Sequence, residues 1–113
     1  MDESELEEEL RNVGVDVHDI ETVDPVDLSY ITAYPGEEVN HMEMGKVLNG
    51  FLDLAREDEW EPKRVEATVL RFEDEAMNTW YAKAEWFEGL LEYRLSETEF
   101  STHVLETLDE DVD

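Results

Sequence analysis

The sequence predicts an α+β fold in which an antiparallel four-stranded sheet is packed by helices, in the order α-β-β-α-β-β-α-α. In some segments apolar residues recur every three to four positions, which is typical of amphipathic helices. In others they alternate with polar residues, which is typical of strands with one buried face. Residues 1–113 are predicted to form a single domain, in which residues 109–113 are a frayed acidic tail.

Helical periodicity dominates two segments of the first half. Leu6, Leu10 and Val13 share one face of a helix predicted over residues 4–13. The longest helix is predicted over residues 37–57, where apolar residues form one stripe. That stripe contains Met44, Val47, Leu48, Phe51, Leu52 and Ala55.

Strand patterns lie between these helices and after them. Two strands are predicted near residues 16–22 and 27–34. A β-hairpin follows, because Val65, Ala67 and Val69 alternate with more polar residues. Its second strand has Trp80, Ala82, Ala84 and Trp86 at period two. Asp24-Pro25 is the predicted turn between the first two strands, and Asp74-Glu75 is the predicted turn of the hairpin.

The helical period returns after the hairpin. Trp86, Leu90 and Leu91 predict a helix that ends near residue 94. Ser96 with Glu99 has the spacing of a capping box, which predicts the start of a last helix. The apolar face of that helix contains Phe100, Val104 and Leu108.

The chain is strongly acidic, with 33 Asp and Glu against 8 Lys and Arg and a formal net charge of −25. The acids are spread along the chain, and 41% of the residues are hydrophobic, so we expect a folded core rather than disorder. Such a chain repels itself in dilute buffer. At about 1 M salt the Debye length falls to about 3 Å, which screens exposed charges. We therefore expect adaptation to concentrated salt, with salt cations bound loosely to the carboxylates.

Three segments carry a resemblance to a known group of proteins. Val65–Leu70, Thr79–Trp86 and the helix start Ser96–Phe100 resemble small acidic proteins of halophilic archaea, which are grouped as a domain of unknown function. The resemblance implies a salt-rich cytoplasm and no assigned activity. It carries over no catalytic residue and no cofactor.

Composition argues against several other classes of protein. The absence of cysteine excludes disulfides and thiolate metal sites. The first residues are acidic, unlike a signal peptide, and no stretch approaches the roughly 18 apolar residues of a membrane helix. We therefore expect a cytoplasmic protein with no membrane contact. The net charge also disfavours binding to nucleic acid.

Motifs for catalysis and cofactor binding are missing from the sequence. Neither GxGxxG, a Walker motif, Gly-x-Ser-x-Gly nor HExxH occurs. His18, His41 and His103 fall in three separate predicted elements, which favours solvated histidines over a metal site. Glu66 and Glu85 lie on predicted strands, where we expect them to be exposed. No catalytic residue, metal or cofactor is predicted, although the sequence does not exclude an enzyme.

The hairpin carries the least acidic surface of the chain, because four of the eight basic residues lie on it. Mixed basic and aromatic residues are typical of interface cores. A solvated face with cross-strand ion pairs and a site for an anionic ligand are the alternatives. We predict a non-catalytic interaction module that binds a protein partner or forms a homodimer. The predicted interface residues are Arg64, Leu70, Arg71, Phe72, Tyr81 and Lys83.

A second functional hypothesis is a regulatory domain that binds a small molecule. It places a pocket between the sheet and the long helix, lined by Tyr30, Met44 and Trp80. A solid core at that place would argue against it. Trp60 lies beside Pro62 in a predicted loop, where it would cover a pocket or complete a dimer contact.

Overall fold

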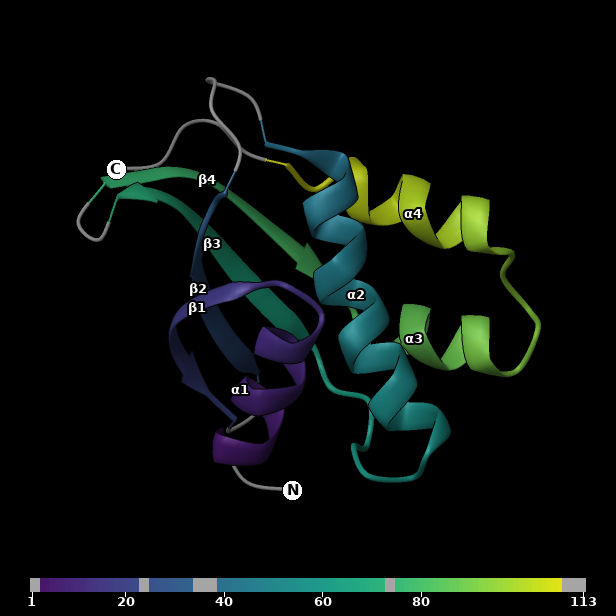
Figure 1. Ribbon diagram of the computed structural model, residues 1–113. Coiled ribbons are helices and arrows are strands. Elements are labelled where there is room, and N and C mark those ends of the chain that lie inside the picture. The colour runs from purple at the N-terminus through teal and green to yellow at the C-terminus, as the bar shows by residue number, and fades with distance from the viewer. Residues whose placement is uncertain (1–2, 23–24, 34–38, 73–74, 109–113) are drawn as a thin grey trace.

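The computed structural model describes residues 3–22, 25–33, 39–72 and 75–108, which contain four helices and one four-stranded sheet (Figure 1). Several predictions concern residues outside this part of the chain. They are the tail at 109–113, the turn residues Asp24 and Asp74, the strand residue Tyr34 and the helix residues 37–38. In chain order the elements are α1 (Glu3–Asn12), β1 (Asp16–Glu21), β2 (Val26–Ile31), α2 (His41–Arg56), β3 (Val65–Phe72), β4 (Glu75–Ala82), α3 (Ala84–Leu91) and α4 (Glu97–Leu105).

The sheet is mixed, so the prediction of an antiparallel sheet was wrong. Its strand order is β1-β2-β3-β4, and the two outer pairs are antiparallel. The central pair is parallel, with Val26 beside Val65 and Ile31 beside Leu70. The cause lies in α2, which connects β2 to β3. A helical crossover returns the chain to the end of the sheet where β2 began, so that β3 runs in the same direction.

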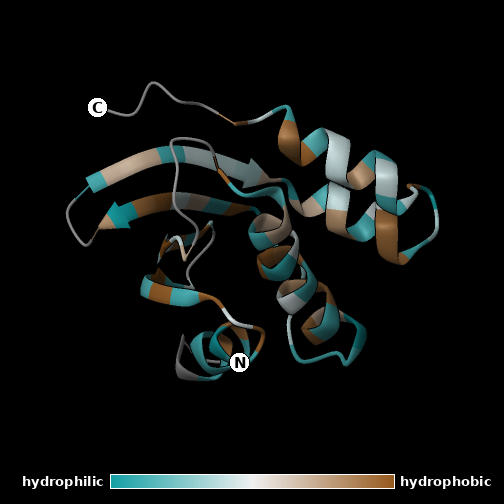
Figure 2. Ribbon diagram, turned by 45° about the horizontal axis from the view of Figure 1, so that its top comes forward, coloured by the Kyte–Doolittle hydropathy of each residue, from teal (hydrophilic) through white to brown (hydrophobic). Residues whose placement is uncertain are grey.

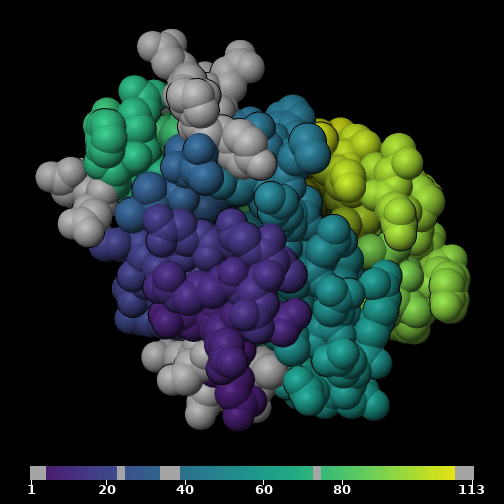
Figure 3. Space-filling view, viewed as in Figure 1, coloured from purple at the N-terminus to yellow at the C-terminus, as the bar shows by residue number. Residues whose placement is uncertain are grey.

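Helices α1 and α2 pack beside each other and bury their apolar faces in the core (Figures 1 and 3). Hydrophobic and hydrophilic segments alternate along α2, as expected for an amphipathic helix (Figure 2). Gly50 lets the two helices approach, because a Cβ there would lie 3.0 Å from the Leu10 Cδ2 atom. The buried strand residues of the same core are Val17, Ile20, Val26, Leu28, Tyr30, Val65, Ala67, Val69, Trp80 and Ala82.

An aromatic cluster joins α2, α3 and α4, the helices at the end of the sheet where β4 finishes. Phe87 of α3 is its centre and is fully buried. Its ring centroid lies 5.2 Å from that of Trp60, 5.4 Å from that of Phe100 and 6.3 Å from that of Phe51. Phe87 therefore connects α3 to both neighbouring helices.

Side-chain hydrogen bonds cap the first turns of helices α2 and α4. Helix α2 begins after Asn40, whose side chain accepts a hydrogen bond from the backbone N–H of Glu43. The predicted capping box of the last helix is confirmed. The Ser96 hydroxyl accepts from the Glu99 N–H at 3.1 Å, and the Glu99 carboxylate accepts from the Ser96 N–H at 3.2 Å. Strand β4 ends at Ala82, four residues before the end of the period-two pattern at Trp86.

A residue with an unusual backbone conformation lies two positions after the end of helix α2. Asp58 has a φ of +58°, and its N–H donates to the Ala55 carbonyl at 3.1 Å. This left-handed position favours glycine, and a carboxylate is repelled by the helix C-terminus. We expect Asp58→Gly to raise the free energy of unfolding by about 1 kcal/mol. Urea unfolding measures this, and a lowered midpoint would contradict it. Asp53→Gly inside the helix is the matched control and is expected to destabilise by about 1 kcal/mol.

Candidate functional site

A patch of basic and aromatic side chains lies where β4 leads into α3. The Arg64 guanidinium carbon is 4.2 Å from the centroid of the Tyr81 ring. The Tyr81 and Trp86 ring centroids are 6.0 Å apart with planes at 17°, and those of Trp86 and His103 are 5.2 Å apart with planes at 19°. Lys83 Nζ lies 5.6 Å from the Trp86 centroid. We call these five half-buried residues the basic–aromatic patch.

Three different parts of the fold position this patch. Tyr81 alternates with the buried residues Trp80 and Ala82, so its ring faces away from the core. Lys83 is the N-cap of α3, and the first turn of that helix brings Trp86 over Tyr81. Thr107 fixes α4, which carries His103, to the edge of β4. Its hydroxyl oxygen accepts from the Tyr81 N–H at 2.9 Å, and its one proton faces two acceptors, the Val104 carbonyl at 2.7 Å and the Tyr81 carbonyl at 3.1 Å.

The two cations of the patch are held by carboxylates next to them in the chain. Arg64 Nε is 2.9 Å from the Glu66 carboxylate, and Lys83 Nζ is 4.0 Å from that of Glu85. These side chains are all more than a third exposed, and exposed ion pairs add little stability. Both cations are therefore accessible to a new partner, above aromatic rings that are already ordered.

The structure divides the predicted interface between the two ends of the hairpin. Arg64, Tyr81 and Lys83 lie together in the patch. Phe72 lies at the other end of β3, about 25 Å away at about 3.3 Å per residue, and is 62% exposed. Arg71 is at that end too and is 4.0 Å from Glu75. The sixth predicted residue, Leu70, is only 7% exposed.

Two residues of the patch were not predicted as interface residues. Trp86 continues the period-two alternation of Trp80 and Ala82, which predicts a core position, and it also begins the predicted helix. In the structure it lies in the first turn of α3, where it is half-buried and packs against the core. His103 was interpreted as a solvated residue, and its stacking on Trp86 depends on how α4 packs. The hairpin pattern therefore points to Arg64, Tyr81 and Lys83 of the patch but not to Trp86 and His103.

A family model described as Domain of unknown function (DUF8159) matches residues 1–113. The chain belongs to this family. No curated protein and no solved structure matches it. The family description assigns no activity.

The predicted pocket residues of the DUF8159 chain all lie in the hydrophobic core. Tyr30, Met44 and Trp80 are each at most 2% exposed. The Trp80 Nε1–H donates to the Tyr30 hydroxyl oxygen at 3.1 Å. A ligand between them would have to displace side chains that are already packed. The pocket stays a prediction, and nothing in the core contacts favours it.

Tyr30 and Glu43 bring polar groups into this core. Burial raises the pKa of Tyr30 well above its usual value, and the nearby charge of Glu43 raises it further, while the hydrogen bond from Trp80 acts in the opposite direction. The phenol therefore stays neutral. Glu43 is 2% exposed, and its Oε2 atom accepts from the Ala33 N–H at 2.9 Å. This bond holds the chain after β2 against the first turn of α2.

The remaining candidate residues are spread over the surface. His18 of β1 and His41 of α2 are exposed. The described residues contain no group of three or more His, Asp and Glu side chains that could hold a metal ion. Glu66 and Glu85 are exposed and paired with cations of the patch. Over the same residues, no helix is long and apolar enough to cross a membrane.

Proposed function

We propose that this DUF8159 protein is a non-catalytic interaction module of a salt-rich archaeal cytoplasm, and that it forms a homodimer through the basic–aromatic patch. The observation that carries this proposal is the continuous stack of Arg64, Tyr81, Trp86 and His103. Aromatic residues and arginine are the side chains most enriched at the centres of interfaces.

The stack also reduces the entropic cost of association. Ordering a flexible side chain at an interface costs about 0.5–1.5 kcal/mol. The rings of the patch are already held in parallel planes by one another and by the Thr107 hydrogen bonds. A partner that packs on them gains contact area without ordering them. Concentrated salt favours the same step, since it screens the repulsion between two chains of charge −25.

The charges around the stack favour a second copy as the partner. Each cation of the patch has a carboxylate beside it, Glu66 next to Arg64 and Glu85 next to Lys83. In a two-fold dimer the same patch of both copies meets, so a surface that carries both signs in adjacent positions can place each cation beside a carboxylate of the other copy. Cyclic dimers of this kind are the commonest homo-oligomers.

Charge reversal in the patch tests the proposal. We expect Arg64→Glu to weaken dimerisation at least about tenfold, because it removes the cation over Tyr81 and adds a carboxylate beside Glu66. Arg71→Glu makes the same charge change at the opposite end of β3 and is expected to change the dimer Kd by less than about twofold. Sedimentation equilibrium in about 2 M KCl measures both Kd values.

The unaltered chain should sediment at twice its 13.2 kDa mass in this experiment. A chain that stays monomeric at about 1 mM would contradict the proposal, since even weak complexes form there. Equal weakening by Arg64→Glu and Arg71→Glu would show that total charge, and not the patch, governs association.

A further inference from the structure

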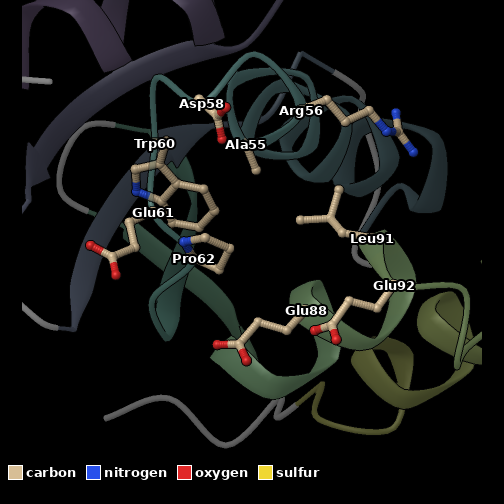
Figure 4. A pocket seen from close by; sticks show the side chains of 9 residues that line it. All are labelled: Ala55, Arg56, Asp58, Trp60, Glu61, Pro62, Glu88, Leu91 and Glu92. Carbon is tan, nitrogen blue, oxygen red and sulfur yellow. The ribbon is translucent and has the colours of Figure 1, made fainter.

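A cleft of about 560 Å³ lies between the C-terminal end of α2 and helix α3 (Figure 4). Its apolar lining comes from Ala55 of α2, Trp60 and Pro62 of the following loop, and Leu91 of α3. Trp60 and Pro62 form one wall and Leu91 stands across from them (Figure 4). Four carboxylates and one cation complete the lining, from Asp58, Glu61, Glu88, Glu92 and Arg56.

Negative charge around the cleft is not balanced by the protein itself. Arg56 is directed away from the cavity, and its guanidinium is 3.6 Å from the carboxylate of Asp53 (Figure 4). Glu92 is paired with Arg94 at 3.2 Å. The other three carboxylates have no ion pair within the part of the chain that the structure describes. They belong to Asp58, Glu61 and Glu88.

We propose that this cleft is a docking site for a partner protein that inserts a lysine or arginine side chain. Such a side chain has an apolar stem and a cationic head. The stem would lie against Trp60, Pro62 and Leu91, while the head would reach the rim, around which the three unpaired carboxylates are spread (Figure 4). A segment with this chemistry matches both parts of the lining at once.

Other occupants match only one part of that lining. A hydrated inorganic cation gains nothing from apolar walls. A purely apolar segment would bury the rim carboxylates without a partner, which carries a large desolvation cost. An acidic segment, including the acidic surface of a second copy, would be repelled by the rim. The proposal therefore commits to a basic segment of a different protein and is independent of the dimer.

The Asp58→Gly variant distinguishes a loss of binding from a loss of stability. The left-handed backbone conformation of Asp58 favours glycine, so Asp58→Gly removes a rim carboxylate while it is expected to stabilise the chain. A loss of binding in this variant cannot result from partial unfolding. Glu61→Gln with Glu88→Gln removes the other two unpaired charges with little change in shape.

The probe is the peptide acetyl-Ala-Ala-Arg-Ala-Ala-amide, and its control carries neutral citrulline in place of arginine. Binding is followed by NMR through the backbone amides of Glu61 and Leu91, in about 0.5 M KCl. We expect saturable shifts with the arginine peptide and none with the citrulline peptide. The double variant should weaken binding about tenfold and Asp58→Gly about threefold. Asp19→Asn on β1 removes one charge, as Asp58→Gly does, and should leave the Kd within about twofold.

Three results would overturn the proposal. Equal binding of the citrulline peptide would mean that the carboxylates do not recognise charge. Equal weakening by Asp19→Asn would mean that the attraction is the general field of an acidic chain. If free ethylguanidinium bound as tightly as the peptide, the site would select small cations and not a protein segment. The Arg64→Glu variant should bind the peptide as tightly as the unaltered chain does. The cleft and the dimer are therefore tested separately, and a peptide that does not bind leaves the dimer proposal intact.

Discussion

Transfer from concentrated to dilute salt is expected to lower the melting temperature of this protein by on the order of 20 °C. The cause is self-repulsion among 33 acidic residues that only 8 basic residues offset. At about 0.1 M salt the Debye length is about 10 Å, so neighbouring carboxylates repel one another, whereas at about 1 M salt it is about 3 Å. The ion pairs of the structure are all partly exposed and do not compensate for this repulsion.

Thermal unfolding followed by circular dichroism, from about 0.1 to 3 M KCl, measures this dependence. Sucrose provides a control, because it favours compact states without screening charge, and it should restore only part of the lost stability. A melting temperature that moved by less than about 3 °C would contradict the idea that the surface is adapted to salt.

Phe87→Ala is expected to lower the free energy of unfolding by about 3–5 kcal/mol. Phe87 is fully buried and contacts three other aromatic rings, from α2, the loop after it and α4. Its removal leaves a cavity at the point where α3 joins the rest of the fold. Since α3 and α4 carry Trp86 and His103, the basic–aromatic patch should lose its geometry as well.

Urea unfolding in about 3 M KCl measures the loss, with Tyr93→Ala as the control. Tyr93 is 95% exposed, so its truncation should change the free energy of unfolding by less than about 0.5 kcal/mol. A loss of less than about 1 kcal/mol in Phe87→Ala would show that the aromatic cluster does not hold the helices together.

Periodicity predicted which residues form helices and strands, because burial on one face leaves a pattern in the sequence. Leu6 and Leu10 are buried on α1 as expected, and Val65, Ala67 and Val69 are buried on β3. Strand pairing is different, since alternation along one strand carries no information about its neighbour. The parallel pairing of β2 and β3 follows from the helix between them, which the prediction of an antiparallel sheet did not take into account.

Strand alternation predicted only those residues of the basic–aromatic patch that lie on or next to the hairpin strands. Arg64, Tyr81 and Lys83 were assigned to the same face of the hairpin, and the structure brings them together. Trp86 lies beyond the end of β4, where the period changes, and His103 reaches the stack through the packing of α4. Likewise, the sequence predicts two alternative roles for Trp60, and its place in the wall of a cleft depends on where α3 lies.

The three tryptophans provide the most direct measurement of the proposed dimer. Trp86 is in the patch, Trp80 is in the core and Trp60 is beside the cleft. On dilution from about 1 mM to 10 μM in about 2 M KCl, the indole N–H resonance of Trp86 should move with concentration while that of Trp80 stays fixed. A Trp86 resonance that does not move over this range, or one that moves no more than that of Trp80, would contradict association through the patch.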